Sequence, residues 1–411
     1  MNPRRVIADL RELAARTSTA DGAQRLAWGP VWRDAREWFK GKVAELGLRI
    51  DTDSAGNNWV TLPGASTKTV IVGSHLDSVP NGGWLDGCLG VTAALEALRM
   101  HAAAPPPVTL KLVDWADEEG ARFGRSLLGS SAAAGSLKID EVRELKDRQG
   151  TRLVDALAEN GVSLDRMLNA HGELKRIDAQ AYLELHIEQG PVLEALGLPL
   201  GVVLGTFGVE RYQVTFQGQA AHAGSTPMDR RRDALAGAAK LELEIREIAR
   251  RVGGGAVCTI GGVVTRPGIV TSVVETAECL LDQRHLDAAK LAEMLSNAEA
   301  GSRRFAEEEN IEVEWERIWN IEPILFDEEL ISLADEAIRE VAGESHRLPS
   351  GPLHDAAEVA RAGVPTVMLF VQSLRGLSHT KLEDTKEEHL ELSVQALDRL
   401  ADKTIARVAA G

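Results

Sequence analysis

Short apolar runs rich in β-branched residues alternate with stretches that carry apolar residues at helical spacing. The strand-like runs near the N-terminus cover 69–73, 108–115 and 181–187, and the helix-like stretches cover 6–15, 31–46 and 91–101. The pattern returns near the C-terminus, with helices expected at 330–342, 356–362 and 387–410 and a buried strand at 366–371. Strands separated by helices favour an α/β fold with a mostly parallel central sheet covered by helices.

The middle of the chain has a different pattern. An alternating strand at 211–218 is followed by a helix at 233–251, strands at 257–264 and 273–282, a helix at 288–308 and a strand at 311–318. This order is typical of a small α+β sandwich. We therefore predict a smaller α+β domain at 210–326, inserted into a discontinuous larger domain of 1–209 and 327–411. The uncharged run 195–209, which holds four glycines and one proline, is interpreted as a linker.

Charge and cysteine content exclude several classes of protein. The 46 Lys and Arg residues against 62 Asp and Glu residues give a net charge of −16, which argues against nucleic acid or an anionic membrane as a partner. No stretch reaches 18 apolar residues, and the first residues lack the apolar core of a secretory signal. The three cysteines form no CxxC pair, so we expect a cytoplasmic protein without a disulfide framework.

Histidine and acidic residues gather where the predicted strands end. His75 and Asp77 follow the first strand, Glu118 and Glu119 follow the second, and His186 lies at the end of the third. His379 comes shortly after the strand at 366–371. Because ligands bind outside the carboxyl ends of the strands in open α/β sheets, we expect these side chains at one edge.

Each of these groups also has an ordinary interpretation. His75-x-Asp77 is either a metal ligand with a carboxylate that orients it or a surface turn, and Asp86 in its glycine-rich segment is either a bridging carboxylate or a turn residue. The acidic pair Glu118 and Glu119 suits a base beside a ligand, or a solvated helix N-terminus. Together with His186 and His379, however, the donors form two three-ligand sets that share one carboxylate, as in dinuclear metal sites.

The motifs that carry these residues occur in a recognisable order. They are GSHLDSVPNGGWLDG, DEEGARFG, ELHIEQGPVLE, AHAGSTPMDRRRDAL, SGPLHDA and GLSHTKLED, between residues 73 and 384. This set resembles the hydantoinase/carbamoylase branch of the dinuclear metal amidases, which is related to aminoacylase-type peptidases. The branch contains N-carbamoyl-L-amino acid hydrolases, β-ureidopropionases and allantoate amidohydrolases.

The resemblance implies a role for each matching residue. One metal ion would be bound by His75 and His186 and the other by Glu119 and His379, with Asp86 bridging, Glu118 as general base and Asp77 orienting His75. Gln189 and Arg284 would bind substrate, and His222 would reach a neighbouring subunit's site to stabilise the oxyanion. The inserted domain would act as a lid and form a homodimer.

Two positions depart from the family pattern. Thr271 stands where the family usually has an asparagine, and Leu353 replaces a glycine expected near the substrate carboxylate. Both positions belong to the pocket that would select the acid portion of the substrate, so we expect an effect on specificity rather than on the reaction.

The expected activity is hydrolysis of the ureido C–N bond of N-carbamoyl-L-amino acids, with two divalent ions per subunit. Zinc or manganese is expected, with cobalt or nickel as alternatives, since the ligand types suit several ions. Allantoate amidohydrolase, β-ureidopropionase and an aminoacylase-like peptidase remain alternatives on the same scaffold. A non-catalytic binding relative is the alternative from another class, and retention of Glu118 beside five metal donors argues against it.

Overall fold

The computed structural model describes all 411 residues, which form two compact units. The first unit comprises Met1–Leu204 and Phe326–Gly411, and the second comprises Gly205–Leu325. Every helix is too short or too polar to cross a lipid bilayer.

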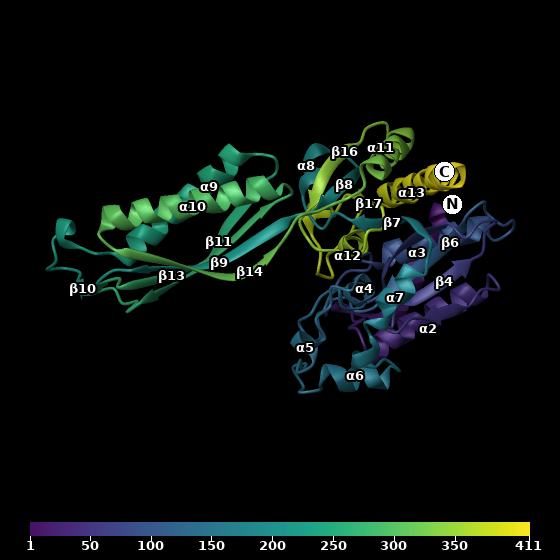
Figure 1. Cartoon of the computed structure of the whole chain (residues 1–411), viewed down its shortest axis with the longest axis horizontal. Helices are drawn as coiled ribbons and strands as arrows, with labels where there is room; N and C mark the ends of the chain where they lie inside the picture. Colours follow the sequence, from purple (N-terminus) through teal and green to yellow (C-terminus); the bar gives the residue numbers. More distant parts are fainter. The chain divides into compact units, whose positions relative to one another are not determined.

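A nine-stranded sheet forms the centre of the first unit (Figure 1). Its strand order is β15 (Ile324–Leu325), β8 (Leu200–Thr206), β17 (Thr366–Val371), β7 (Ala179–Ile187), β5 (Thr69–His75), β6 (Thr109–Trp115), β4 (Asn58–Leu62) and β3 (Ile50–Thr52), with β16 (His346–Ser350) beside β8. All residues of β5 and β17 are buried, as expected of strands covered on both faces.

The sheet is mixed, so the expectation of a mostly parallel sheet was wrong. The four central strands β17, β7, β5 and β6 are parallel to one another, whereas β8 pairs antiparallel with β17, β4 with β6, and β3 with β4. A turn of only five residues, 53–57, joins β3 to β4, and a connection this short permits only antiparallel pairing. The four parallel strands are the ones that bring the site residues to one edge.

The run 195–209, interpreted from sequence as a linker, instead contains β8. Its glycines allow close packing and do not mark a flexible connection. A Cβ on Gly201 would lie 2.7 Å from Leu348 Cδ2, and one on Gly205 would lie 2.2 Å from the carbonyl oxygen of Ile324. Small residues therefore let neighbouring strands approach β8 closely.

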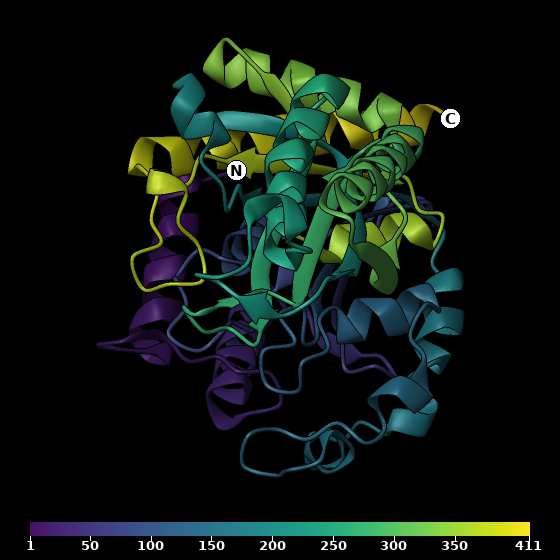
Figure 2. The same cartoon turned by 90° about the vertical axis from the view of Figure 1, so that its left-hand side faces the viewer.

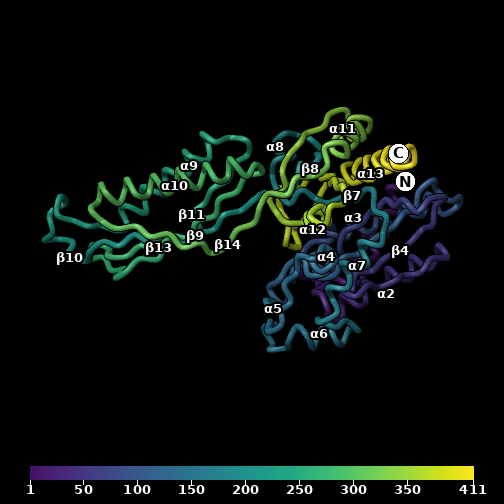
Figure 3. The backbone as a smooth tube through the Cα atoms, in the orientation of Figure 1, coloured from purple at the N-terminus to yellow at the C-terminus, as the bar shows by residue number.

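Helices of the first unit pack in two groups against the sheet. One group is α1 (Pro3–Thr17), α3 (Cys88–His101), α11 (Glu328–Ala342) and α13 (Glu387–Ala410), and the other is α4 (Leu128–Ala134), α7 (Asn169–Lys175) and α12 (Asp355–Arg361). The remaining elements are α2 (Pro30–Ala44), α5 (Ile139–Val142), α6 (Leu153–Glu159), α8 (Val192–Leu196), the strands β1 (Ser18–Thr19) and β2 (Gly22–Ala23), and short 3-10 turns at Leu164–Arg166 and Leu374–Gly376. The Met1 ammonium lies 2.6 Å from Asp398 Oδ2, so the N-terminus is held against α13 (Figure 3).

The second unit has the order of strands and helices predicted from the sequence. Its antiparallel sheet is β11 (Val257–Arg266), β13 (Thr276–His285), β9 (Gly208–Gln217) and β14 (Glu312–Ile321). Helices α9 (Ala234–Val252) and α10 (Ala288–Glu309) run side by side along one face (Figures 1 and 2). Val214 and Phe216 on β9 are buried beneath them, which explains the alternation in the sequence. A small ribbon of β10 (Ala221–His222) and β12 (Ser272–Val273) and a 3-10 turn at Met228–Arg230 complete the unit.

Candidate metal centre

Parallel strands bring the predicted donors to one edge of the central sheet. His75 is the last residue of β5, and His186 is the second-last residue of β7. Glu118 and Glu119 follow β6, which is parallel to β5, and His379 follows β17 through a short loop. Neighbouring parallel strands end at the same side, so residues far apart in sequence meet there.

The first group of donor atoms comes from His75, Asp86 and His186. Asp86 Oδ1 lies 3.6 Å from His75 Nε2 and 3.2 Å from His186 Nε2. The three side chains are buried, and their donor atoms all lie within 4.8 Å of one another. Donor atoms this close together can surround one cation.

The second group shares Asp86 and adds Glu119 and His379. His379 Nε2 lies 3.5 Å from Asp86 Oδ2 and 3.3 Å from Glu119 Oε2. The two oxygens of Asp86 therefore face different groups, Oδ1 toward His75 and His186 and Oδ2 toward His379. A carboxylate in this position can bridge two cations.

The charges of the site favour bound cations. The ion pairs of Asp77, Asp86, Glu118 and Glu119 involve only histidines and no lysine or arginine. Burial raises the pKa of Glu118 and of Glu119 well above the ordinary value, and neighbouring carboxylates raise both further. The buried Nε2 atom of His75 has no hydrogen-bond partner. Clustered acids of this kind require compensation, which divalent cations would provide, so the residues fit a two-metal site.

Asp86 differs from the other carboxylates of the site. Burial would raise its pKa, but the hydrogen bond with His186 and the nearby His75 and His379 lower the pKa below the ordinary value. The side chain is therefore ionised, as required of a shared metal ligand.

Glu118 lies beside the two donor groups and belongs to neither. Its Oε2 is 3.7 Å from His75 Nε2, and its side chain is almost fully buried. Asp77 holds this segment, because its carboxylate accepts hydrogen bonds from the backbone N–H groups of Glu118 at 3.2 Å and Glu119 at 3.1 Å. A carboxylate held next to the donor atoms is well placed to move a proton.

Asp77 approaches His75 through two oxygens. His75 Nδ1 lies 3.2 Å from the backbone carbonyl oxygen of Asp77 and 3.6 Å from its Oδ1. The carbonyl is the closer acceptor, and a hydrogen bond from Nδ1 to it leaves Nε2 free to bind a cation.

Gln189, predicted to bind substrate, lies at the second donor group. Its Nε2 donates to Asp86 Oδ2 at 2.8 Å and lies 3.3 Å from His379 Nε2. Three residues here have left-handed backbone conformations, with φ of 60° at Asp117, 57° at Gln189 and 55° at His379. Such conformations cost free energy and are enriched at functional sites.

His222, Thr271 and Arg284, which were predicted to contact substrate, belong to the second unit. His222 on β10 is paired with Ser272 on β12, and its Nδ1 accepts from the N–H groups of Gly224 and Ser225 at 3.1 and 3.2 Å. Nδ1 is therefore unprotonated, and Nε2 carries the proton when the ring is neutral. Arg284 donates to Asp282 through Nε at 2.7 Å.

Several residues near the donors were not predicted as site residues. His354 directly follows half-buried Leu353, and the centroid of its ring lies 4.5 Å from that of His186. Trp28 Nε1 donates to Asp117 Oδ2 at 2.7 Å. Glu383, in the GLSHTKLED motif, accepts from the backbone N–H of Asp86 at 3.0 Å. Its place in the same motif as His379 was the only sequence signal.

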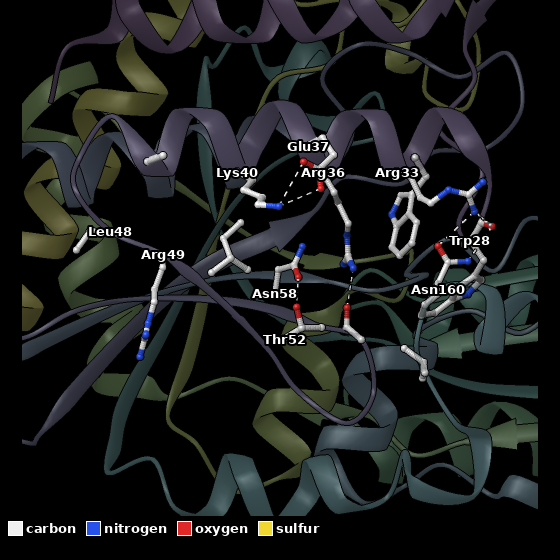
Figure 4. Close-up of a pocket in the computed structure, with 15 residues that line it drawn as sticks. Trp28, Arg33, Arg36, Glu37, Lys40, Leu48, Arg49, Thr52, Asn58 and Asn160 are labelled. Atoms are coloured by element: carbon white, nitrogen blue, oxygen red, sulfur yellow. Dashed lines mark hydrogen bonds and ion pairs between the residues drawn. The ribbon is translucent and has the colours of Figure 1, made fainter.

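A cavity of about 550 Å³ lies away from these donors, between α2 and the strands β3 and β4 (Figure 4). Arg36 on its wall binds Asp114 at 2.8 Å, and Lys40 lies 3.4 Å from Glu37. Since none of the metal donors lines it, we do not associate it with the metal centre.

Comparisons with known proteins identify the family of the chain. Residues 71–403 match Peptidase family M20/M25/M40. An N-carbamoyl-L-amino acid amidohydrolase of Geobacillus stearothermophilus is 36% identical over 381 residues, covering 92% of each chain, and an allantoate amidohydrolase of Escherichia coli is 35% identical over 383 residues, also covering 92% of each. A crystal structure of an amidase of the hydantoinase/carbamoylase family from Burkholderia multivorans superposes with a TM-score of 0.88 at 31% identity, covering 99% of this chain and 98% of that one. The resemblance inferred from the motifs is confirmed, and the chain belongs to Peptidase family M20/M25/M40.

Proposed function

We propose that this protein is a metal-dependent amidohydrolase that cleaves the ureido C–N bond of N-carbamoyl-L-amino acids, giving the amino acid, ammonia and carbon dioxide. The proposal rests on one observation, the sharing of Asp86 between two donor groups with Glu118 beside them. Relatives named for N-carbamoyl-L-amino acids and for allantoate support ureido compounds as the substrate class.

The residues of the first unit have distinct roles in this reaction. His75, Asp86 and His186 would hold one divalent ion, and Asp86, Glu119 and His379 the other. Such a pair of ions would polarise the ureido carbonyl and lower the pKa of a water molecule. Glu118 accepts the proton of the attacking water and returns it to the leaving nitrogen. Asp77 keeps Glu118 and His75 in position.

Residues of the second unit would complete the site. His222 would donate from Nε2 to the developing oxyanion in a neighbouring subunit, and Arg284 would bind the substrate carboxylate in a bidentate manner. Gln189, Thr271 and Leu353 would contact the substrate. This assignment implies a homodimer in which residues 210–326 act as dimerisation domain and lid, next to a catalytic domain of 1–209 and 327–411.

The types of donor atom and the state of the cysteines support proposals for the metal ions and for the cellular compartment of the protein. Mixed imidazole and carboxylate donors suit zinc or manganese, with cobalt or nickel as alternatives. The three cysteines are free, which suits the reducing cytoplasm.

Allantoate amidohydrolase is the second candidate, because the relatives named for the two activities are almost equally similar, at 36% and 35% identity. A β-ureidopropionase activity is the third. A panel of substrates separates these candidates. It contains N-carbamoyl-L-α-amino acids, N-carbamoyl-β-alanine, allantoate and N-acetyl-amino acids, each assayed for ammonia and amine release with each metal. Fewer than two bound ions and no turnover of any ureido compound would reject the proposal.

Substitution of the proposed base tests the mechanism directly. Glu118→Gln keeps the size of the side chain but removes its ability to accept a proton. We expect two bound ions per subunit, as in the wild type, and turnover reduced by about 10²–10⁴-fold. Near-normal turnover in this variant would remove Glu118 from the role of base.

A further inference from the structure

Glu383 is a buried acid in the loop that follows His379, and its side chain binds the segment around Asp86. Only 2% of the residue is exposed. Its Oε1 accepts hydrogen bonds from the backbone N–H groups of Leu85 at 3.1 Å and Asp86 at 3.0 Å, almost 300 residues away in sequence. Glu383 forms no ion pair, so its carboxylate receives its hydrogen bonds from backbone N–H groups and one hydroxyl.

The segment before Asp86 is built to accommodate this side chain. A Cβ on Gly83 would lie 2.1 Å from Glu383 Oε1 and 2.2 Å from Cδ, so only glycine permits this approach. The carboxylate of Glu383 therefore holds the backbone of Asp86 directly.

The second oxygen of Glu383 connects the same carboxylate to the His379 segment. Oε2 accepts from Ser378 Oγ at 3.0 Å, and Ser378 Oγ also lies 3.0 Å from Asp86 Oδ2. The backbone N–H of Glu383 donates to the carbonyl of Thr380 at 3.0 Å, which closes a turn directly after His379. One side chain thus joins the two segments that supply Asp86 and His379.

We propose that Glu383 is a positioning residue that sets the spacing between Asp86 and His379 for the second divalent ion. The inference rests on the proposed two-metal function and deepens it. His75 and His186 lie on β5 and β7, whose ladders hold them independently of Glu383. Asp86 belongs to both donor groups, but the first group keeps these two histidines, so loss of Glu383 weakens the second ion more than the first.

The test measures the two ions separately. Metal-free wild type, Glu383→Ala and Glu383→Asp are titrated with Mn²⁺ by calorimetry, and ion content after dialysis is measured by mass spectrometry. We expect the second affinity to fall by about ten-fold or more, as supporting groups around metal ligands usually show, and the first affinity to change less. Raised Mn²⁺ should partly restore kcat, which a general loss of folding would not allow.

Glu388 provides a matched control on the exposed first turn of α13. Glu388→Ala and Glu388→Asp should bind both ions as the wild type does. If Glu383→Ala does not fold, the affinities of Glu383→Asp test the inference instead, because the shorter aspartate side chain cannot reach the two N–H groups and Ser378 together.

The possible outcomes distinguish this inference from the proposed function. A wild type with two ions and a folded Glu383 variant with the same two affinities would overturn only the inference. A loss of both ions in equal measure would also overturn it. A wild-type protein with fewer than two ions would overturn the proposed function and the inference together.

Discussion

Two neighbouring tryptophans of the first unit differ in a single hydrogen bond. Trp28 and Trp32 are both buried, with ring centroids 4.9 Å apart. Trp28 Nε1 donates to Asp117 Oδ2 at 2.7 Å, whereas the buried Nε1 of Trp32 has no partner. Burial and the nearby carboxylate of Asp77 raise the pKa of Asp117 to about 8, and the bond from Trp28 opposes this rise. Since Asp117 directly precedes Glu118, Trp28 supports the segment that carries the proposed base.

Substitution of each tryptophan by phenylalanine separates the hydrogen bond from packing. Trp28→Phe removes the indole donor from a buried acid and should lower the free energy of unfolding by about 1–3 kcal/mol more than Trp32→Phe does. Trp28→Phe should also reduce kcat, whereas Trp32→Phe should not. Urea unfolding followed by circular dichroism and steady-state kinetics provide the measurements. Equal effects of the two substitutions would show that the bond to Asp117 contributes nothing.

Four of the five proposed metal donors could be predicted because they lie at or shortly after the ends of recognisable strands, and parallel strands end at a common edge. Asp86 lies eleven residues after β5 and was assigned through its glycine-rich motif. Trp28 and Glu383 could not, because each acts through a partner 89 or more residues away and no local pattern records that contact. The position of Gln189 against Asp86 also depends on its left-handed backbone, which the sequence HIEQGP does not reveal.

Among the secondary-structure elements, those with strong patterns were predicted and those with weak patterns were not. The buried strand β17 and the amphipathic helix α10 were recognised from their residues. β8 was mistaken for a linker because its glycines serve close packing between strands, and β4 was missed because its five residues give no clear periodicity.

The start of α10 gives a pH-dependent test at the scale of one helix. Asp287 Oδ1 accepts from the N–H groups of Lys290 at 3.1 Å and Ala289 at 2.7 Å, and these bonds lower the pKa of Asp287. A carboxyl group whose pKa is lower in the folded state than in the unfolded state stabilises the folded state at pH values above its ordinary pKa. This contribution is lost as the pH falls through the folded-state pKa.

Asp287 should therefore protect the first turn of α10 from hydrogen exchange near neutral pH, and this protection should be lost as the pH falls through the lowered pKa of Asp287. Asp287→Ala should exchange faster at neutral pH, and its difference from the wild type should shrink on acidification. Asp287→Asn retains an oxygen acceptor without the charge and should show less pH dependence. A difference between alanine variant and wild type that stays constant with pH would exclude the charge as the cause.

At the scale of the whole molecule, the chain divides the proposed chemistry between its two units. The five metal donors and Glu118 lie in the first unit, while His222, Thr271 and Arg284 lie in the second. The chain enters and leaves the second unit through paired strands, with Thr206 opposite Ile324 and Gly205 opposite Leu325. Opposed residues of an antiparallel pair are about 5 Å apart, so a short linker can replace everything between them.

Replacement of residues 207–323 by a linker of a few glycines and serines tests this division. Because every donor is retained, we expect the shortened protein to bind two divalent ions. Because the proposed oxyanion donor and carboxylate-binding residue are removed, turnover of the ureido substrate should fall by at least about 10²-fold. The double variant His222→Ala and Arg284→Ala of the full chain should show a similar loss with the second unit present. Retained turnover in the shortened protein would show that the first unit carries out the reaction without the second. Loss of both ions would mean that the metal donors are ordered only when the second unit is present.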